Sequence, residues 1–309
     1  MIMFITLMIT LWSLICLSCS SIIMIWVCME MVSFFFFPVL LNNNWGSVSL
    51  KVSVWKFFFI QGLSSMILFL SLMYYSFFDI SLNLSYLMVL SILLKMGLPP
   101  FHKWMVEVSE NISWRSFYIM NVIQKFPPLL VLMVWLDNSN FLLFYSWISC
   151  LFSIYGIFCH SVRQFMVYSS IMNISWMIYS INVGFKPFLM FFLIYSILMV
   201  FTTVHFHNFN AKSAEFNDFG VGGKYSTTFR LSFVFCILSL MGMPPFVGFY
   251  PKIFIIHNST NFIDCFPLLL FSIIMVYSYL KIIFGFIILN GLNLKSYYKL
   301  NSFMSFIVP

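Results

Sequence analysis

Charged side chains are scarce in this sequence. Only 7% of the 309 residues are Asp, Glu, Lys or Arg, whereas 62% are hydrophobic, and the mean hydropathy is +1.01. A soluble domain carries roughly a quarter charged residues, so this composition excludes a water-soluble globular protein. We expect an all-α, polytopic membrane protein that is embedded in a lipid bilayer.

The sequence also lacks the motifs that bind nucleotides and metals. Neither Gly-x-Gly-x-x-Gly nor Gly-x-x-x-x-Gly-Lys-[Ser/Thr] occurs in it. Cys16 and Cys19 form a Cys-x-x-Cys inside an apolar run, with no second pair to complete a four-ligand zinc or iron–sulfur site. We therefore expect no cofactor, no metal and no nucleic acid on this chain. The start shows no cleavable signal, which predicts insertion without processing.

Long charge-free runs indicate helices that cross a bilayer. One runs from Met1 to Met29 and another from Pro187 to Ala211, and about 20 residues suffice to cross the hydrocarbon core. We predict ten spans, at residues 2–18, 21–41, 56–78, 82–107, 115–136, 141–159, 164–183, 187–207, 229–258 and 262–290. The fourth and the ninth are too long for one straight crossing.

The positive residues are distributed unevenly between the two ends of these spans. Most predicted loops on the N-terminal side contain Lys or Arg, whereas the opposite side has Lys186 and the acids Asp79, Asp137 and Asp264. The positive-inside rule therefore predicts that the N-terminus lies on the matrix or cytoplasmic side.

One motif occurs twice, once in each half of the chain. Met96–Phe101 reads MGLPPF and Met241–Phe246 reads MGMPPF. Each copy lies in the fourth span of a five-span half, and five is odd, so the second half must be inverted. Gly/Pro interruptions at matching positions of two halves are typical of discontinuous helices in transporters; ordinary proline kinks are the simpler interpretation. The expected breaks involve Gly97, Pro99, Pro100, Gly242, Pro244 and Pro245.

Four ionisable residues lie inside the predicted spans. They are Glu30, Lys95, Lys125 and Lys252. A charge within the membrane costs at least a few kcal/mol, so such residues normally face the bundle interior and mark ion or proton pathways. An opposite charge favours the charged form of a lysine, whereas burial favours the neutral amine, so these groups could hold and release protons. The simpler alternatives are a static ion pair at Glu30 and a Lys252 that extends to the interface.

Several segments resemble a known family. The most specific are Pro99-Pro100-Phe101-His102-Lys103-Trp104 and Gly242–Lys252, and supporting ones surround Glu30, Lys125 and Tyr168. Taken in order from the second span to the ninth, they are similar to the antiporter-like membrane subunits of mitochondrial NADH:ubiquinone oxidoreductase, the respiratory complex I.

The resemblance implies two inverted five-helix units, each with a broken helix, at residues 1–136 and 141–290, followed by a short tail at 291–309. It implies proton-path roles for Glu30, Lys95, Lys125 and Lys252. It also implies a place in the mitochondrial inner membrane, among the core and accessory subunits of the membrane arm, with FMN, the iron–sulfur clusters and ubiquinone bound elsewhere in the complex. This chain would then be a subunit of an NADH:ubiquinone reductase with no redox site of its own.

The chain departs from the family pattern at one position. The family usually has a His two residues after the Tyr-Ser-Ser-Ile segment, where this chain has Asn173. Because Asn cannot titrate, a relay there would need water or the hydroxyls of Tyr168, Ser169 or Ser170.

The sequence leaves three functions open. The first is a proton-translocating subunit of complex I, which the order of the motifs favours. The second is a stand-alone cation/proton antiporter with the same architecture. The third is a membrane scaffold in which buried charges only fix how the helices pack.

Overall fold

The computed structural model describes residues 2–19, 21–41, 48–77, 82–135, 139–208, 227–259 and 261–291. These residues are helical, with short connections and no strand among them. The helices of the first half are α1 (Ile2–Ser18), α2 (Ile22–Leu41), α3 (Val48–Phe77), α4 (Leu82–Met96), α5 (Lys103–Asn111), α6 (Trp114–Asn121), the 3₁₀ turn η1 (Ile123–Lys125) and α7 (Phe126–Trp135). Those of the second half are α8 (Ser139–Ser153), the 3₁₀ turn η2 (Ile154–Phe158), α9 (Val162–Val183), α10 (Phe185–Asn208), α11 (Thr227–Met241), α12 (Phe249–Asn258) and α13 (Phe262–Gly291).

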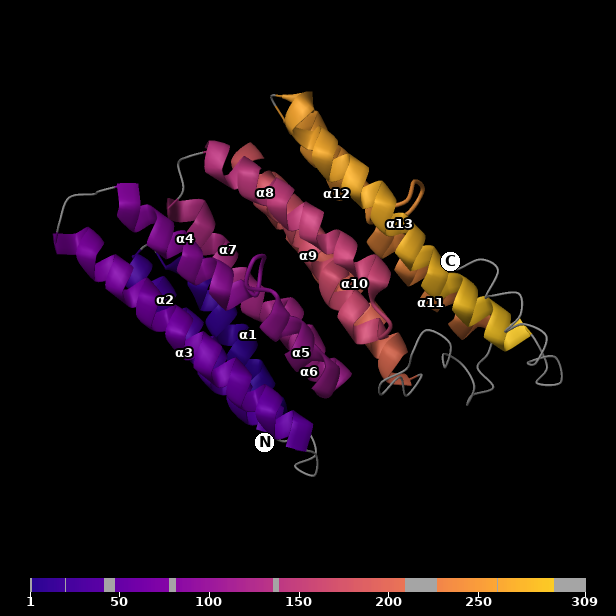
Figure 1. The fold of residues 1–309 in the computed structure, drawn as a ribbon, viewed down its shortest axis with the longest axis horizontal. Coiled ribbons are helices and arrows are strands. Elements are labelled where there is room, and N and C mark those ends of the chain that lie inside the picture. The colour runs from indigo at the N-terminus through magenta and orange to yellow at the C-terminus, as the bar shows by residue number, and fades with distance from the viewer. Residues whose placement is uncertain are drawn as a thin grey trace.

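The helices lie side by side and lean in a common direction (Figure 1). α1, α2 and α3 form one flank, α8, α9 and α10 occupy the middle, and α11, α12 and α13 form the other flank. Neighbours in sequence pack closely, as α1 does with α2, α3 with α4, and α8 with α9.

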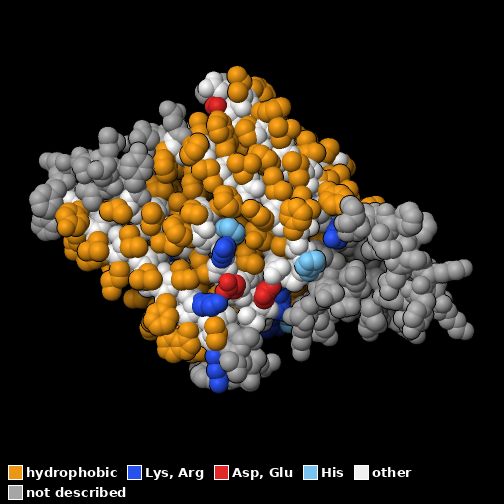
Figure 2. All heavy atoms as spheres, viewed as in Figure 1, with side chains coloured by type: hydrophobic (Ala, Val, Ile, Leu, Met, Phe, Trp, Pro, Cys, Tyr) orange, Lys and Arg blue, Asp and Glu red, His pale blue; other side chains and the backbone are white. Residues whose placement is uncertain are grey.

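The described helices include six that are long and apolar enough to cross a membrane. These segments are Ile23–Leu41, Leu50–Tyr74, Trp114–Val134, Phe141–Phe158, Phe185–Asn208 and Phe262–Phe284. Three shorter apolar helices cover Met3–Ser18, Leu87–Met96 and Leu231–Met241. The face in Figure 2 is almost wholly apolar, and its charged side chains gather mainly toward one end. This surface suits hydrocarbon, so the predicted all-α membrane class is confirmed.

The third helix is longer than predicted. It begins at Val48, not at residue 56, and its additional turns carry Lys51, while Lys56 follows one turn later. Both lysines are exposed, and Lys56 pairs with Glu107 of α5. The prediction began the helix where the apolar run begins, but a membrane helix can continue into the polar interface.

Both predicted interruptions are present in the structure. α4 ends at Met96 and α5 begins at Lys103, and α11 ends at Met241 and α12 begins at Phe249. In each copy the glycine has a positive φ, 64° at Gly97 and 73° at Gly242, a conformation that glycine adopts without steric cost. The N–H of the residue after each glycine donates across the turn to a helix carbonyl, Leu98 to Leu93 and Met243 to Leu238.

α9 lies at the centre of the molecule. From Phe165 to Ile181 every residue except the half-buried Tyr168 is buried. A helix that is buried on all sides has no apolar stripe to orient it. Four of its serines, Ser169, Ser170, Ser175 and Ser180, donate to the carbonyl three residues earlier in the helix.

Candidate functional site

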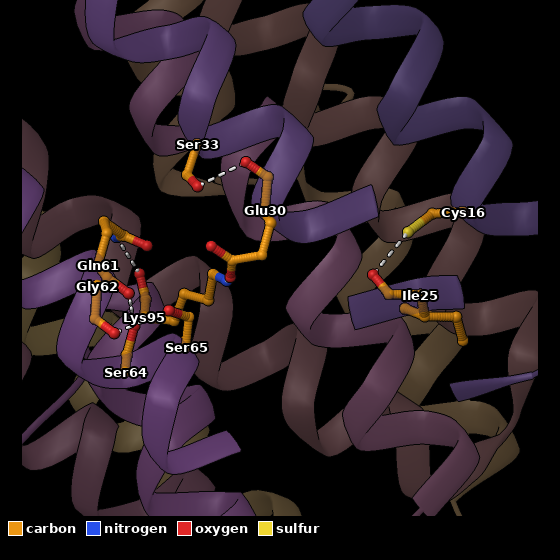
Figure 3. A network of polar contacts seen from close by, with 9 residues as sticks. All are labelled: Cys16, Ile25, Glu30, Ser33, Gln61, Gly62, Ser64, Ser65 and Lys95. Carbon is orange, nitrogen blue, oxygen red and sulfur yellow. Dashed lines mark hydrogen bonds and ion pairs between the residues drawn. The ribbon is translucent and has the colours of Figure 1, made fainter. Parts of the chain in front are cut away.

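Glu30 and Lys95 form an ion pair between α2 and α4. The Lys95 Nζ lies 2.5 Å from the Glu30 Oε1, and the two side chains point toward one another in Figure 3. The Lys95 side chain is 5% exposed, whereas that of Glu30 is 32% exposed. The Lys95 side chain is thus enclosed by protein. The Glu30 carboxylate, which α2 carries, compensates the positive charge of Lys95.

The carboxylate opens on a hollow of about 410 Å³ between α2 and α3. Among the described residues, the polar side chains that line this hollow are those of Glu30, Ser33 and Gln61. The remaining walls are mostly aromatic, with Phe34, Phe37, Phe57 and Phe58 among them. Glu30 therefore has an exit toward the outer surface of the bundle that Lys95 does not have.

The interruption of α4 frees backbone groups beside Lys95. The last four carbonyls of a helix have no partner within it, and the carbonyl of Lys95 is one of these. The Gln61 side-chain amide of α3 donates to it at 3.0 Å. In the loop that follows, the Tyr145 hydroxyl of α8 donates to the Pro99 carbonyl. Side chains from neighbouring helices thus stabilise the broken segment.

Lys125 is buried without a carboxylate. Its Nζ lies 3.1 Å from the Ser170 Oγ of α9 and 3.4 Å from the Asn121 Oδ1 of α6, one turn earlier in the same span. The Ser170 hydroxyl also lies 3.1 Å from that Asn121 oxygen. Among the described residues, the hydrogen-bond partners of the Lys125 amine are therefore neutral oxygens. Lys95 differs, because its partner is a carboxylate.

A small cavity separates Lys95 from the turn that carries Lys125. Its volume is about 10 Å³, and its lining includes Ser33, Lys95 and Gln124. The Gln124 side-chain nitrogen is buried and has no hydrogen-bond partner. Space of about 10–15 Å³ with polar neighbours can hold one water molecule. The cavity is therefore the place where a water could link Lys95 to Gln124, next to Lys125 in sequence.

Lys252 is buried in the second half of the chain. Its Nζ donates to the carbonyl oxygen of Met241 at 2.8 Å and lies 5.8 Å from the centre of the Trp176 ring. It does not extend to the interface, so that alternative is wrong. Among the described residues no hydrogen bond or ion pair joins Lys252 to Lys125.

The two copies of the repeated motif carry different charges. Lys95 precedes the first motif directly, and Leu240 has that place before the second. Lys252 follows the second motif at the spacing at which Glu107 follows the first. The motif thus repeats the break in the helix, while the ionisable groups around it do not repeat.

Of the four possible relay residues on α9, Ser170 contacts a lysine. Ser169 donates to the Met166 carbonyl, and the Asn173 side-chain amide donates to the Ser169 carbonyl at 3.1 Å. The Tyr168 ring lies 5.8 Å from the ring of His102. Of the four, Ser170 is thus the best-placed neighbour of Lys125.

The sequence alone predicts no role for five residues that contribute to the site, Gln61, Asn121, Gln124, Tyr145 and Trp176. Two of these had a usable signal: Asn121 precedes Lys125 by one helical turn, which places both on one face, and Gln61 interrupts an apolar run. Tyr145 contacts Pro99, and Trp176 contacts Lys252, in each case far away in the sequence. The residues around Tyr145 and Trp176 in the sequence therefore give no sign of these contacts.

Comparison with known proteins gives a consistent result. A family profile described as the transmembrane region of NADH:quinone oxidoreductase and Mrp antiporters matches residues 19–280. NADH-ubiquinone oxidoreductase chain 2 of Anopheles gambiae is 30% identical over 306 residues, which cover 94% of this chain and 85% of that protein. The protein of the same name from Lumbricus terrestris is 32% identical over 283 residues, covering 88% and 82%.

Two solved structures share the fold. Respiratory complex I from Thermus thermophilus contains a chain that matches with a TM-score of 0.72 at 18% identity, over 85% of this chain and 65% of that one. The Mrp complex of a Dietzia species contains one that matches with a TM-score of 0.81 at 14% identity, over 91% and 59%. This chain thus spans about three fifths to two thirds of the length of those subunits.

Proposed function

The chain belongs to the family of NADH:quinone oxidoreductase and Mrp antiporter membrane subunits, and from this premise we propose that it translocates protons as a core membrane subunit of respiratory complex I. The name shared by its relatives, NADH-ubiquinone oxidoreductase chain 2, supports this assignment and a mitochondrial inner membrane location. Electron transfer from NADH to ubiquinone would occur on other subunits, and this chain would bind no redox cofactor.

The observation that carries the proposal is the ion pair of the buried Lys95 with Glu30, together with a second buried lysine, Lys125, whose neighbour in sequence, Gln124, lines a small cavity beside Lys95. Ionised groups are costly inside a membrane and persist there mainly where they serve a pathway. A static pair would need only one lysine. A second lysine, whose described partners are neutral oxygens, offers another group that can accept the proton.

The geometry supports a specific sequence of events. While Glu30 contacts Lys95, the attraction of the carboxylate keeps the amine protonated. When the carboxylate turns toward the hollow between α2 and α3, Lys95 is left as an unpaired buried cation, which is unfavourable. Its proton would then pass through a water beside Gln124 to Lys125, where the Ser170 and Asn121 oxygens accept from the protonated amine.

We further propose that ten spans form two inverted five-helix units, at residues 1–136 and 141–290, with residues 291–309 as a tail and the N-terminus in the matrix. The matching backbone turns at Gly97 and Gly242 support the repeat. In the second unit Lys252 is the proton-path residue beside the break. Asn173 stands where the family usually has a His, so water or a hydroxyl of Tyr168, Ser169 or Ser170 would continue the path.

The expected partners are the other core and accessory subunits of the membrane arm. The hollow beside Glu30 supports this, because a carboxylate directed toward lipid would be costly. The second candidate is a stand-alone cation/proton antiporter, and the Mrp-like fold favours it.

The deciding experiment measures proton transfer into vesicles that contain the intact complex, with NADH and a quinone as substrates. Lys95→Met should lower the number of protons moved per NADH while the complex still assembles. Lys56→Met removes an exposed lysine and should change neither quantity. Unchanged pumping in the Lys95 variant would contradict the proposal, and cation/proton exchange by the full chain alone in vesicles would favour the antiporter.

A further inference from the structure

A groove of about 510 Å³ lies outside the proposed proton path, where α1 and α6 of the first half meet α10 of the second. α1, the span formed by α6 and η1, and α10 build its walls. Its lining residues are Met3, Thr6, Leu7, Thr10, Arg115, Tyr118, Ile119, Ile123, Val200, Thr203 and Val204. This volume is within the range of about 300–1,000 Å³ that is typical of ligand sites.

The groove runs from one end of the bundle toward its middle. Met3 and Arg115 lie in the first turns of α1 and α6, and Val204 lies in the last two turns of α10. Thr10 of α1 and Ile123 of η1 lie further from this end. With a rise of 1.5 Å per residue the groove extends about 10 Å along the helix axes. In the topology proposed above, one end would lie at the membrane interface and the other would reach the hydrocarbon.

The walls of the groove are mainly apolar, although three threonines line it. The hydroxyl groups of its three threonines donate to carbonyls of their own helices, Thr6 to Met3, Thr10 to Leu7 and Thr203 to Val200. These hydroxyl donors are therefore already used within the helices. Leu7 and Val204 are more than half exposed along it. Such walls suit a flexible hydrocarbon chain.

The mouth of the groove carries a cation. Arg115 is exposed, and neither ion pair in the described part of the chain involves it. Tyr118 lies about one turn deeper, at the depth where an amphipathic ring suits the headgroup region of a bilayer. A guanidinium matches the geometry of a phosphate through paired N–H donors. An apolar groove below a single cation is complementary to an anionic headgroup that carries an acyl chain.

We propose that this groove binds one anionic phospholipid, with its phosphate at Arg115 and an acyl chain between α1 and α10. Basic pockets between membrane helices bind such headgroups on the side that the positive-inside rule assigns to the matrix, and the N-terminal ends of α1 and α6 lie on that side in our topology. The site does not require the proton path, so the two proposals can fail independently.

The test uses the full chain, purified from vesicles of phosphatidylglycerol and phosphatidylcholine, with retained lipid counted by native mass spectrometry. The wild-type chain should retain one phosphatidylglycerol in preference to phosphatidylcholine. Arg115→Gln should lower that occupancy roughly tenfold, because a charged hydrogen bond is lost, and Arg115→Lys should retain part of it. Val204→Trp should lower the occupancy by filling the groove without changing the charge. Lys51→Gln, which removes an exposed cation from α3, should retain the lipid.

Three outcomes would overturn the proposal. The first is equal retention of phosphatidylglycerol by the wild type and by both the Arg115→Gln and Val204→Trp variants. The second is displacement of the lipid by inorganic phosphate at equal concentration, which would indicate a site for the free anion. The third is a photoreactive group at position 7 that, in native membranes, links to a protein helix and not to lipid.

Discussion

Lys252 donates a hydrogen bond to the carbonyl oxygen of Met241, the last residue of α11, at 2.8 Å. The bond joins the two pieces of the helix interrupted at Gly242, since Lys252 lies in α12. The same amine thus supports the break and supplies a buried titratable group beside it. This dual role predicts that its removal affects stability as well as transport.

Lys252→Met should lower the free energy of unfolding by about 1 kcal/mol, because a helix-terminal carbonyl loses its donor. Lys252→Arg keeps a donor and should recover part of that loss. Thermal unfolding of the full chain in detergent micelles would measure the difference. If the Met variant unfolds at the wild-type temperature, the hydrogen bond does not stabilise the break.

Glu30→Gln should abolish most proton transfer in the assembled complex, because the amide cannot hold Lys95 in its charged form. The matched control is Glu107→Gln. Its ion pair with Lys56 is about half exposed on both sides, and exposed pairs contribute roughly 0–1 kcal/mol. We expect pumping by the control to stay within about twofold of wild type. Equal losses in the two variants would show that burial of the pair has no special importance.

Ser170→Ala should slow proton transfer several-fold, because Lys125 keeps only the more distant Asn121 oxygen as a partner. Ser180→Ala is the control on the same helix, since the Ser180 hydroxyl donates to the Met177 carbonyl of α9 and to no other helix among the described residues. Proton transfer per NADH, measured at equal amounts of assembled complex, separates the two. A loss of the same size at Ser180 would point to general disturbance of α9.

Gly242→Ala should destabilise the chain by about 1–2 kcal/mol or more, because an L-residue resists a positive φ. An added Cβ would also lie 2.8 Å from the Lys252 Nζ. Gly62→Ala is the control within α3, where an added Cβ meets nothing within 4 Å; there the change should stabilise the helix slightly. Thermal unfolding of both variants measures this contrast, and an unaffected Gly242 variant would show that the turn is not required.

The sequence was sufficient to predict the class of fold and the two helix interruptions. Composition alone required a membrane protein, and the repeated Gly and Pro residues located both breaks. Glu30 and several lysines stood out because charges are so costly within apolar spans. These signals are local, so they can be read without knowing which helices meet.

The partners of those charges could not be predicted in the same way. Glu30 pairs with Lys95 and not with Lys125 because α2 meets the end of α4 at that depth. The contact between Lys252 and Met241 depends on how the chain folds back after Gly242. The Ser170 hydroxyl reaches Lys125 from a helix of the other half. Such contacts follow from helix packing, which the apolar pattern of a fully buried helix such as α9 does not encode.

The hollow beside Glu30 has a consequence for biogenesis. The Glu30 side chain is 32% exposed beside this hollow, so a copy with no neighbour at the opening would leave a partly uncovered acid next to acyl chains, which is unfavourable. Association with a neighbour would then be driven by relief of this exposed charge.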